Sequence, residues 1–206
     1  MRVANITRKT KETDVEVKLE LDVSREPEID SGSGFFDHML TLFASFAGIS
    51  LKVKCSGDTW VDFHHSAEDI GIAMGEAFKE ALGDKKGINR YGQRIMPMDE
   101  ALVMVALDIS GRAYLSYDVE LRASRLNDDG ALTAAKVGVF DTELVEEFFT
   151  AFTRSAGVTL HIKKICGKNT HHIIEAVFKG FGKALGEAIK IDPANAGAVP
   201  STKGVL

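Results

Sequence analysis

The stretch His-His-Ser-Ala-Glu at residues 64–68 recurs as His-His-Ile-Ile-Glu at residues 171–175. Both have the form His-His-x-x-Glu, and together they contain four of the six histidines in the chain. On a helix, each histidine of such a pentad lies three or four positions from the glutamate, so both imidazoles share a face with the carboxylate. The sequence therefore predicts a metal-chelating edge that occurs twice.

The apolar residues around each pentad repeat one order of predicted elements. Each pentad opens a helix with a buried apolar stripe, at residues 64–82 and 171–189. Two strands, a helix and a third strand precede the first pentad, at residues 2–9, 14–23, 35–47 and 49–55. The same four elements precede the second pentad, at residues 101–108, 112–121, 144–152 and 158–166. The order β-β-α-β-α occurs twice, which indicates duplication of one unit.

Two helices that face one side of an antiparallel sheet in each half predict an α+β fold, a two-layer sheet-and-helix sandwich. The boundaries that we expect are residues 1–86 for the first half, 87–190 for the second half and 191–206 for a tail. Predicted loops and turns separate the elements: residues 27–34, the connecting segment 87–97, the polar loop 127–130 and the candidate helix N-cap Asp141. The composition of the tail gives it no hydrophobic reason to be ordered; if it is ordered, we expect a ligand or a neighbouring chain to hold it.

The bulk composition excludes several classes of protein. With 206 residues, 45% of them hydrophobic, the chain can bury one large core or two small ones. A net charge of −5 without a basic block argues against nucleic-acid binding. We expect no membrane span and no secretory signal, because no long apolar run occurs. Cys55 and Cys166 lie in strands that we expect to be buried and form no CxxC motif, which favours a reduced, cytoplasmic setting.

Imidazole and carboxylate ligands suit manganese, iron, zinc, cobalt or nickel, and the lack of nearby thiolates disfavours a structural zinc site. Adjacent histidines on one helix point about 100° apart, so both can hardly serve one ion. A duplicated pair more naturally builds two metal sites, each fed by both halves. His38 is the obvious further ligand, 26 residues before His64, and the corresponding position before His171 is Glu147. A carboxylate there is also able to bind a metal.

Other residues are less specific by type alone. His161 is best explained as a strand histidine with satisfied hydrogen bonds. Glu12 is either a solvated charge or a catalytic carboxylate. Three residues offer phosphate contacts but are more often surface charges: Arg90, Arg112 and Lys203, with Ser201 as a further donor. Four acidic residues either orient imidazoles or cap helices and turns: Asp62, Asp69, Asp99 and Glu100. The pentads do not match HExxH, so a zinc-protease interpretation is weak.

Seven motifs, in order, carry a resemblance to a known family. They are Lys11-Glu12-Thr13, the stretch 34–40 (GFFDHML), 64–69 (HHSAED), 97–101 (PMDEA), 108–112 (DISGR), 169–172 (NTHH) with Glu175, and 200–204 (PSTKG). The sequence resembles the imidazoleglycerol-phosphate dehydratases of histidine biosynthesis along essentially its whole length. The resemblance implies a duplicated fold of the ribosomal protein S5 domain 2-like type, assembled into a homo-oligomeric shell of 24 subunits.

The resemblance also implies two Mn²⁺ ions per active site, at subunit interfaces, and a small phosphorylated imidazole as substrate. The implied metal ligands are His38, His64, His65, Glu68, His171, His172 and Glu175, with Glu147 where the family often has a histidine. The implied catalytic residues are Glu12, Glu68 and Glu175. The implied substrate-binding residues are Glu12, Arg90, Arg112, Ser201 and Lys203, and the tail would close the active site.

The implied reaction converts D-erythro-imidazole-glycerol phosphate to imidazole-acetol phosphate and water. No carbonyl lies beside the C2–H bond of this substrate, so its proton is not acidic in the usual way. A metal that favours the imidazolate form would allow the C3 hydroxyl to leave once Glu12 moves the C2 proton. Two other functions remain open from the residues: a di-metal phosphoester hydrolase and a metal-storage shell, although storage bundles use Glu-x-x-His on long helices.

Overall fold

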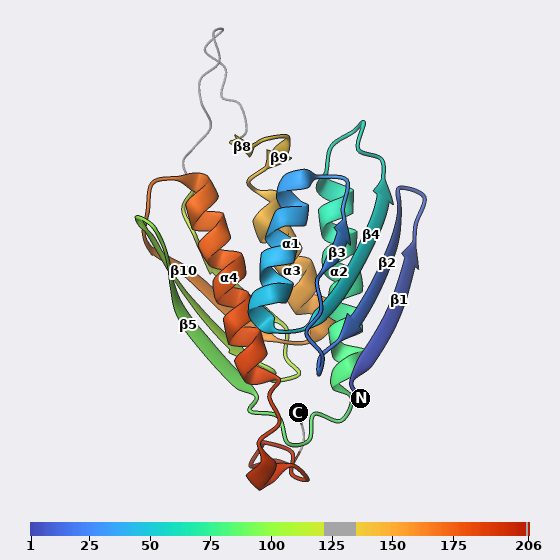
Figure 1. Ribbon diagram of the computed structural model, residues 1–206, viewed down its shortest axis with the longest axis vertical. Helices are drawn as coiled ribbons and strands as arrows, with labels where there is room; N and C mark the ends of the chain where they lie inside the picture. The colour runs from blue at the N-terminus through green and yellow to red at the C-terminus, as the bar shows by residue number, and fades with distance from the viewer. Residues whose placement is uncertain (122–134, 205) are drawn as a thin grey trace, which may run out of the picture.

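The computed structural model describes residues 1–121, 135–204 and 206, and the two halves of the chain each contribute a four-stranded sheet and two long helices (Figure 1). The first half contains β1 (Val3–Lys9), β2 (Thr13–Glu20), β3 (Glu28–Asp30), α1 (Gly34–Ala47), β4 (Ser50–Gly57) and α2 (His64–Leu82). The second half contains β5 (Tyr91–Met98), β6 (Ala101–Asp108), β7 (Tyr114–Asp118), α3 (Leu144–Ala156), β10 (Thr159–Cys166) and α4 (Thr170–Ala188). The short strands β8 (Lys136–Val137) and β9 (Phe140–Asp141) precede α3, and the 3-10 turn η1 (Pro193–Asn195) follows α4.

The two sheets have the same design, with strand orders β1-β2-β4-β3 and β5-β6-β10-β7. The predicted α+β fold and the duplication of its elements are confirmed. The expectation of wholly antiparallel sheets is wrong at one edge of each sheet, because β3 runs parallel to β4 and β7 runs parallel to β10. The strand β3 falls inside a predicted loop, since three residues are too few to show an alternating pattern.

The strand β5 occupies most of the segment that we predicted to be a simple connection. Only Gly92 and Met96 of this strand are buried, so its sequence shows no clear apolar alternation. A Cβ atom at Gly92 would collide with the backbone oxygen of Ala184, which places α4 directly against the strand. Glycine at this position therefore allows a helix-to-strand approach that a hydrophobicity pattern does not reveal.

Three further predictions need correction. The strand predicted at residues 112–121 is shorter, Tyr114–Asp118. Asp141 lies in β9 and does not cap α3, whose N-cap is Glu143. Cys166 is exposed, while Cys55 is buried as expected, because β10 changes register at its end between Lys164 and Cys166. The predicted loop at residues 127–130 lies outside the described residues.

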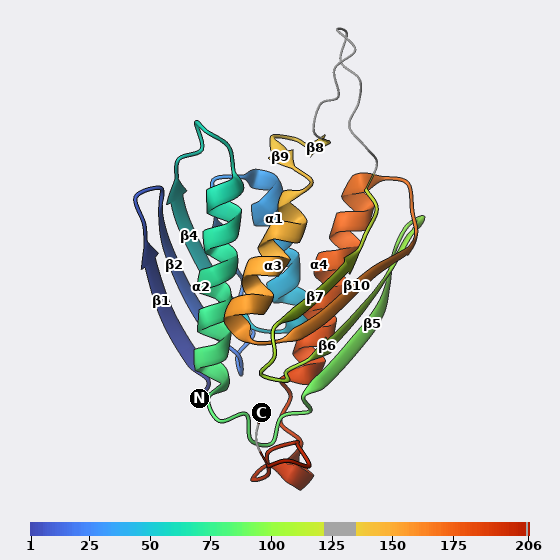
Figure 2. The ribbon, with the colours of Figure 1, turned by 180° about the vertical axis from the view of Figure 1, so that it is seen from behind.

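The helices lie between the two sheets and pair across the halves, α2 with α3 and α1 with α4 (Figure 2). Phenylalanine side chains fill the space between them and are fully buried: Phe36, Phe43, Phe148, Phe149, Phe152, Phe178 and Phe181. Glycines let the paired backbones approach closely, with Gly71 and Gly75 against α3 and Gly182 and Gly186 against α1. None of the helices in the described ranges is long and apolar enough to cross a lipid bilayer.

The close approach of α2 to α3 gives a prediction for stability. We expect Gly75→Ala to lower the free energy of unfolding by about 1–3 kcal/mol, because overpacking a tight contact forces neighbours apart. The added Cβ atom would lie 2.7 Å from both the Phe152 oxygen and the Ser155 Cβ atom. Denaturant unfolding measures this change. Gly34→Ala is the matched control, since a Cβ there meets no described atom within 4 Å, and equal stability of the two variants would contradict the packing argument.

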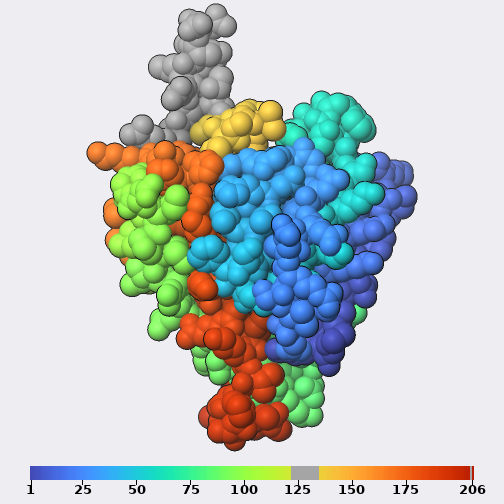
Figure 3. Space-filling view, in the orientation of Figure 1, coloured from blue at the N-terminus to red at the C-terminus, as the bar shows by residue number. Residues whose placement is uncertain are grey.

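The tail after residue 191 makes hydrogen bonds to the segment that joins the two halves of its own chain. The backbone of Gly87 donates to the Ala198 oxygen at 2.8 Å and accepts from the Asp192 N–H at 2.7 Å. The Arg90 guanidinium donates to the Pro200 oxygen at 2.9 Å. The tail lies at one end of the molecule, and the starts of α2 and α4 lie at the other (Figure 3).

Candidate active site

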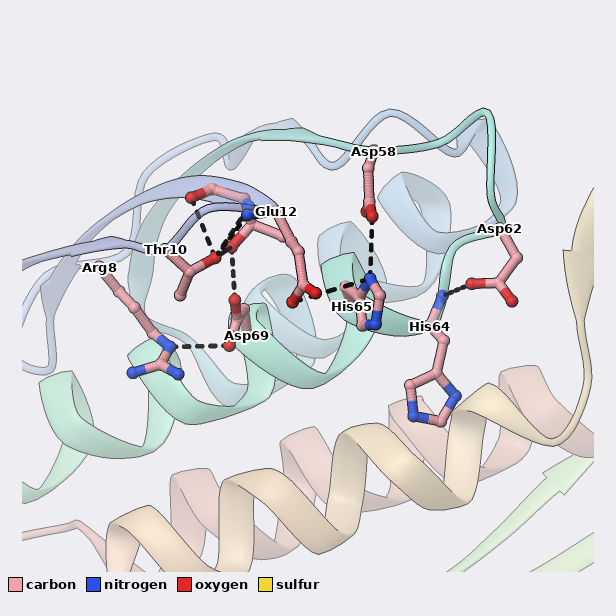
Figure 4. A network of polar contacts seen from close by, with 9 residues as sticks. Arg8, Thr10, Glu12, Asp58, Asp62, His64, His65 and Asp69 are labelled. Atoms are coloured by element: carbon pink, nitrogen blue, oxygen red, sulfur yellow. Dashed lines mark hydrogen bonds and ion pairs between the residues drawn. The ribbon is translucent and has the colours of Figure 1, made fainter.

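Both pentads lie at the same end of the molecule, where α2 and α4 begin (Figure 1). The Asn169 side chain caps α4 by accepting hydrogen bonds from the N–H groups of His171 and His172. At the start of α2, the Asp62 carboxylate accepts a hydrogen bond from the His64 N–H at 2.8 Å (Figure 4). The prediction that each pentad opens the last helix of its half is confirmed.

His38, His171 and Glu175 form the one group in the described ranges whose donor atoms lie close enough to hold a metal ion, all within 4.8 Å of one another. The pairing of α1 with α4 brings His38 to the pentad. The Oε2 atom of Glu175 lies 3.2 Å from the Nε2 atom of His171 and 3.7 Å from that of His38. Two imidazoles and a carboxylate that converge in this way fit a divalent transition metal.

Glu175 is buried and is held ionised by a lysine one helical turn away. Burial opposes ionisation of this carboxyl group, but the hydrogen bond and charge of Lys179 outweigh it and keep the pKa of Glu175 below its ordinary value. A carboxylate that stays ionised at neutral pH is suited to bind a metal ion rather than to donate a proton.

The second histidine of each pentad is held by a carboxylate at its Nδ1 atom. Asp58 lies 3.0 Å from Nδ1 of His65, and Glu100 lies 2.7 Å from Nδ1 of His172. These hydrogen bonds raise the pKa of both histidines, and the His172 contact, with two backbone donors, lowers the pKa of Glu100 to about 2. A carboxylate only accepts, so Nδ1 carries the proton and Nε2 remains available as a metal ligand.

Glu12 lies at the tip of the hairpin between β1 and β2, beside the first pentad (Figure 4). The hydroxyl of Thr10 accepts hydrogen bonds from the backbone N–H groups of Glu12 and Thr13 and so fixes the turn. Thr13 in turn donates to Asp69 of α2, which also pairs with Arg8 at 2.7 Å. The Oε2 atom of Glu12 lies 3.9 Å from Nδ1 of His65, and its side chain is 55% exposed.

The predicted phosphate-binding residues gather at the opposite end of the molecule, around the tail. Arg90 forms two hydrogen bonds to Asp108, at 2.7 and 3.1 Å, besides its bond to Pro200. Arg112 is mostly exposed and lies 3.9 Å from Asp108. The Ser201 hydroxyl accepts from the Lys203 N–H at 3.2 Å. Arg90 therefore positions the turn that carries Ser201 and Lys203, while Arg112 remains open to a ligand.

Five of the predicted metal ligands do not join a metal-binding group within the described part of the chain: His64, His65, Glu68, Glu147 and His172. Glu147 nevertheless occupies the place that corresponds to His38: each lies nine residues before the last residue of its helix, Ala47 or Ala156. The sequence-based equivalence of His38 and Glu147 therefore agrees with the helix positions. No contact in the described residues tests whether Glu147 is a ligand, and it stays a prediction.

Sequence reasoning missed Asp58 and Lys179 and left Glu100 open. Lys179 follows Glu175 by four residues on α4, a spacing that predicts an ion pair. Asp58 lies in a loop after β4, seven residues before His65, and no periodicity signals its contact. Among the acidic residues considered for orienting imidazoles, Glu100 does so directly. The other three are Asp62, which accepts a hydrogen bond from the His64 N–H, Asp69, which accepts one from Thr13 of the hairpin, and Asp99, which lies 3.8 Å from His172.

Comparison with known proteins gives one consistent result. The family model described as imidazoleglycerol-phosphate dehydratase matches residues 31–185. The imidazoleglycerol-phosphate dehydratase of Listeria welshimeri is 54% identical over 206 residues, which cover the full length of both chains. The match to the Listeria enzyme spans both pentads, both sheets and the tail.

Solved structures agree with the sequence comparison. The crystal structure of imidazoleglycerol-phosphate dehydratase from Staphylococcus aureus superposes with a TM-score of 0.79 at 43% identity, covering 92% of this chain and 99% of that one. The enzyme from Pyrococcus furiosus gives a TM-score of 0.79 at 39% identity, covering 98% and 100% of the two chains. The chain belongs to the imidazoleglycerol-phosphate dehydratase family, a family of hydro-lyases.

Proposed function

We propose that the protein dehydrates D-erythro-imidazole-glycerol phosphate to imidazole-acetol phosphate in L-histidine biosynthesis. The observation that carries the proposal is the convergence of His38, His171 and Glu175 in a chain that matches dehydratases over its full length. The full-length match favours this function over a phosphoester hydrolase or a metal-storage shell.

We propose two Mn²⁺ ions per active site as cofactors. His38, His171 and Glu175 would hold one ion, with ligands of the first pentad (His64, His65 and Glu68), His172 and Glu147 completing the two sites. Imidazole and carboxylate donors fit Mn²⁺ without selecting it over iron or zinc, so metal identity is decided by measurement. When bound, the metal ions stabilise the imidazolate form of the substrate.

The chain's own residues would carry the proton transfers and hold the phosphate. In the reaction the C2–H and C3–O bonds break and one water molecule leaves. Glu12 removes the C2 proton, since its exposed carboxylate stands beside a pentad. The departing C3 hydroxyl takes up one proton, equal in number to the proton lost from C2, and leaves as water; the pentad carboxyl groups of Glu68 and Glu175 are the proposed carriers of this proton beside Glu12. Arg112, Ser201 and Lys203 bind the phosphate.

The separation of these groups supports a homo-oligomer with sites between subunits. The helices α2 and α4 have 19 residues each, so the pentads lie about 28 Å from the helix ends near the tail. A substrate of this size cannot reach both ends of one chain. We therefore propose that the tail of one copy closes the site at the pentads of another, in a shell of 24 subunits. The outer face of the second sheet exposes Tyr91, Ile95 and Tyr114, which suits a protein–protein contact.

We propose a cytoplasmic location, which agrees with free thiols at both Cys55 and Cys166. The assembly is tested by light scattering. A particle of about 24 times the 22.4 kDa chain mass supports the shell, whereas a monomer that retains full turnover would contradict sites shared between subunits.

The function itself is tested by a direct assay. We expect purified protein with Mn²⁺ to convert imidazole-glycerol phosphate to the ketone, followed by ultraviolet absorbance. Removal of the metal with a chelator should abolish turnover, and re-addition of Mn²⁺ should restore it. The control is the same chelated protein supplied with Mg²⁺, which imidazole ligands bind less well. Absence of turnover in metal-replete, assembled protein would contradict the proposed function.

A further inference from the structure

The duplication places two glutamates at equivalent positions, Glu12 and Glu100. Each immediately precedes the second strand of its half, β2 or β6. The residue that follows each glutamate lies against a glycine of the neighbouring strand or its end: Thr13 pairs with Gly57, and a Cβ atom at Gly167 would lie 2.9 Å from the Ala101 Cβ. Both carboxylates also point to the second histidine of the pentad in their own half. One ancestral position has thus given rise to two residues beside two equivalent imidazoles.

The two glutamates nevertheless make different contacts. Glu100 accepts hydrogen bonds from the Lys168 N–H, the Asn169 N–H and Nδ1 of His172, at 3.2, 2.7 and 2.7 Å. Glu12 is 3.9 Å from Nδ1 of His65, beyond hydrogen-bond distance, and its side chain has no hydrogen bond to any described residue. The Glu100 carboxylate is fully used in hydrogen bonds to His172 and to the backbone before α4. The Glu12 carboxylate makes no such bonds and is available to contact a substrate.

Asp58 accounts for the difference. It follows the last residue of β4, and its carboxylate accepts a hydrogen bond from Nδ1 of His65 at 3.0 Å (Figure 4). In the register of the two sheets, Gly57 pairs with Thr13, and a Cβ atom at Gly167 would lie 2.9 Å from the Ala101 Cβ. The two glycines therefore correspond, and the residue that corresponds to Asp58 is Lys168. A lysine side chain only donates hydrogen bonds and cannot accept one from Nδ1, so in the second half Glu100 makes this contact with His172.

We propose that Asp58 is a positioning residue that holds Nδ1 of His65 and thereby keeps the Glu12 carboxylate uncommitted for proton transfer. The inference rests on the proposed function of Glu12, but the geometry that it explains does not. Asp58 is suited to this role because it is 6% exposed. Its second oxygen, Oδ1, has no hydrogen-bond partner among the described atoms. The hydrogen bond with His65 is therefore the one that the buried carboxylate makes with a described side chain.

The test is the variant Asp58→Ala. We expect Glu12 to move onto His65 and adopt the contact that Glu100 makes with His172. A crystal structure of the metal-free variant should show a Glu12 oxygen within hydrogen-bond distance of Nδ1 of His65. Turnover should fall about tenfold to a hundredfold in kcat, with little change in KM and with bound metal retained. Asp58→Asn keeps an acceptor at the same place and should restore most of the turnover.

A double-mutant cycle separates positioning from a merely structural role. In a Glu12→Gln background assayed with excess Mn²⁺, which offsets any weaker metal binding, Asp58→Ala should lower turnover less than about threefold, because no carboxylate remains to be captured. Asp14→Ala is the matched control: it removes another aspartate of the same hairpin, whose carboxylate pairs with Lys9 at the surface, and should leave turnover unchanged. Thermal unfolding of all variants checks the fold, which should hold because Asp58 contacts the hairpin through its backbone N–H.

Two results would overturn the inference. One is a Glu12 carboxylate that stays clear of His65 in the Asp58→Ala structure. The other is an equal loss of turnover with and without the Glu12→Gln change. If the wild-type protein shows no dehydratase turnover, the proposed function fails, and the position of Glu12 in the variant structure still decides for or against the inference.

Discussion

Replacing His171 with alanine is expected to remove bound metal and to lower turnover at least about a hundredfold. Bound metal contributes several kcal/mol to charge stabilisation, and each 1.4 kcal/mol is a factor of ten in rate. His171 is central to the one described metal-binding group, since its Nε2 atom lies 3.2 Å from Glu175 and its ring lies 6.1 Å from that of His38. Elemental analysis after dialysis, beside the dehydratase assay, measures both effects.

His161→Ala provides the matched control for this variant. His161 is an exposed histidine of β10 whose ring lies 5.6 Å from Tyr114, on the outer face of the second sheet. It should keep its metal content within about twofold, because it lies outside the group formed by His38, His171 and Glu175. If His171→Ala kept its full complement of metal, the assignment of His38, His171 and Glu175 as a metal site would be wrong.

The duplicated helices and central strands were predictable because their apolar residues repeat at regular spacing. The strand β2 shows this well, with Val15, Val17 and Leu19 all buried on one face. The strand β5 was not predicted, because the residue that packs against the backbone of α4 is Gly92. Glycine has no side chain, so this buried position does not appear as an apolar residue in a hydrophobicity pattern. The edge strand β3 was not predicted either, because its extended conformation follows from pairing with β4 and not from a pattern in its own sequence.

The candidate site was predictable in its ligand types and less so in its geometry. The spacing of the pentads on a helix identifies His171 and Glu175 as neighbours, and the structure brings His38 to them. The contacts of Asp58 with His65 and of Glu100 with His172 join residues from separate segments, which no local spacing encodes. The same holds for the distance between the pentads and Arg112, which follows from helix length and direction in the folded chain.

Glu12→Gln is expected to lower turnover about 10²- to 10⁴-fold while leaving metal content and stability unchanged, because positioned acid–base groups contribute rate factors of that size. The backbone of Glu12 makes the contacts that hold the hairpin: its N–H donates to Thr10, and its carbonyl accepts from the Asp58 N–H. The side chain is 55% exposed and free of such contacts. Glutamine keeps the shape of the residue and removes only its ability to take a proton.

Glu12 and Glu100 are equivalent by duplication, but we assign proton transfer to Glu12 and the positioning of His172 to Glu100. Comparing Glu100→Gln with Glu12→Gln distinguishes these two roles. Glu100 holds His172 at 2.7 Å and two backbone N–H groups. Its replacement should weaken metal binding, by about ten- to a hundredfold in affinity, and excess Mn²⁺ should recover turnover. Excess Mn²⁺ should not recover turnover in Glu12→Gln. If it does, or if Glu12→Gln loses metal, Glu12 supports the metal site and does not transfer the C2 proton.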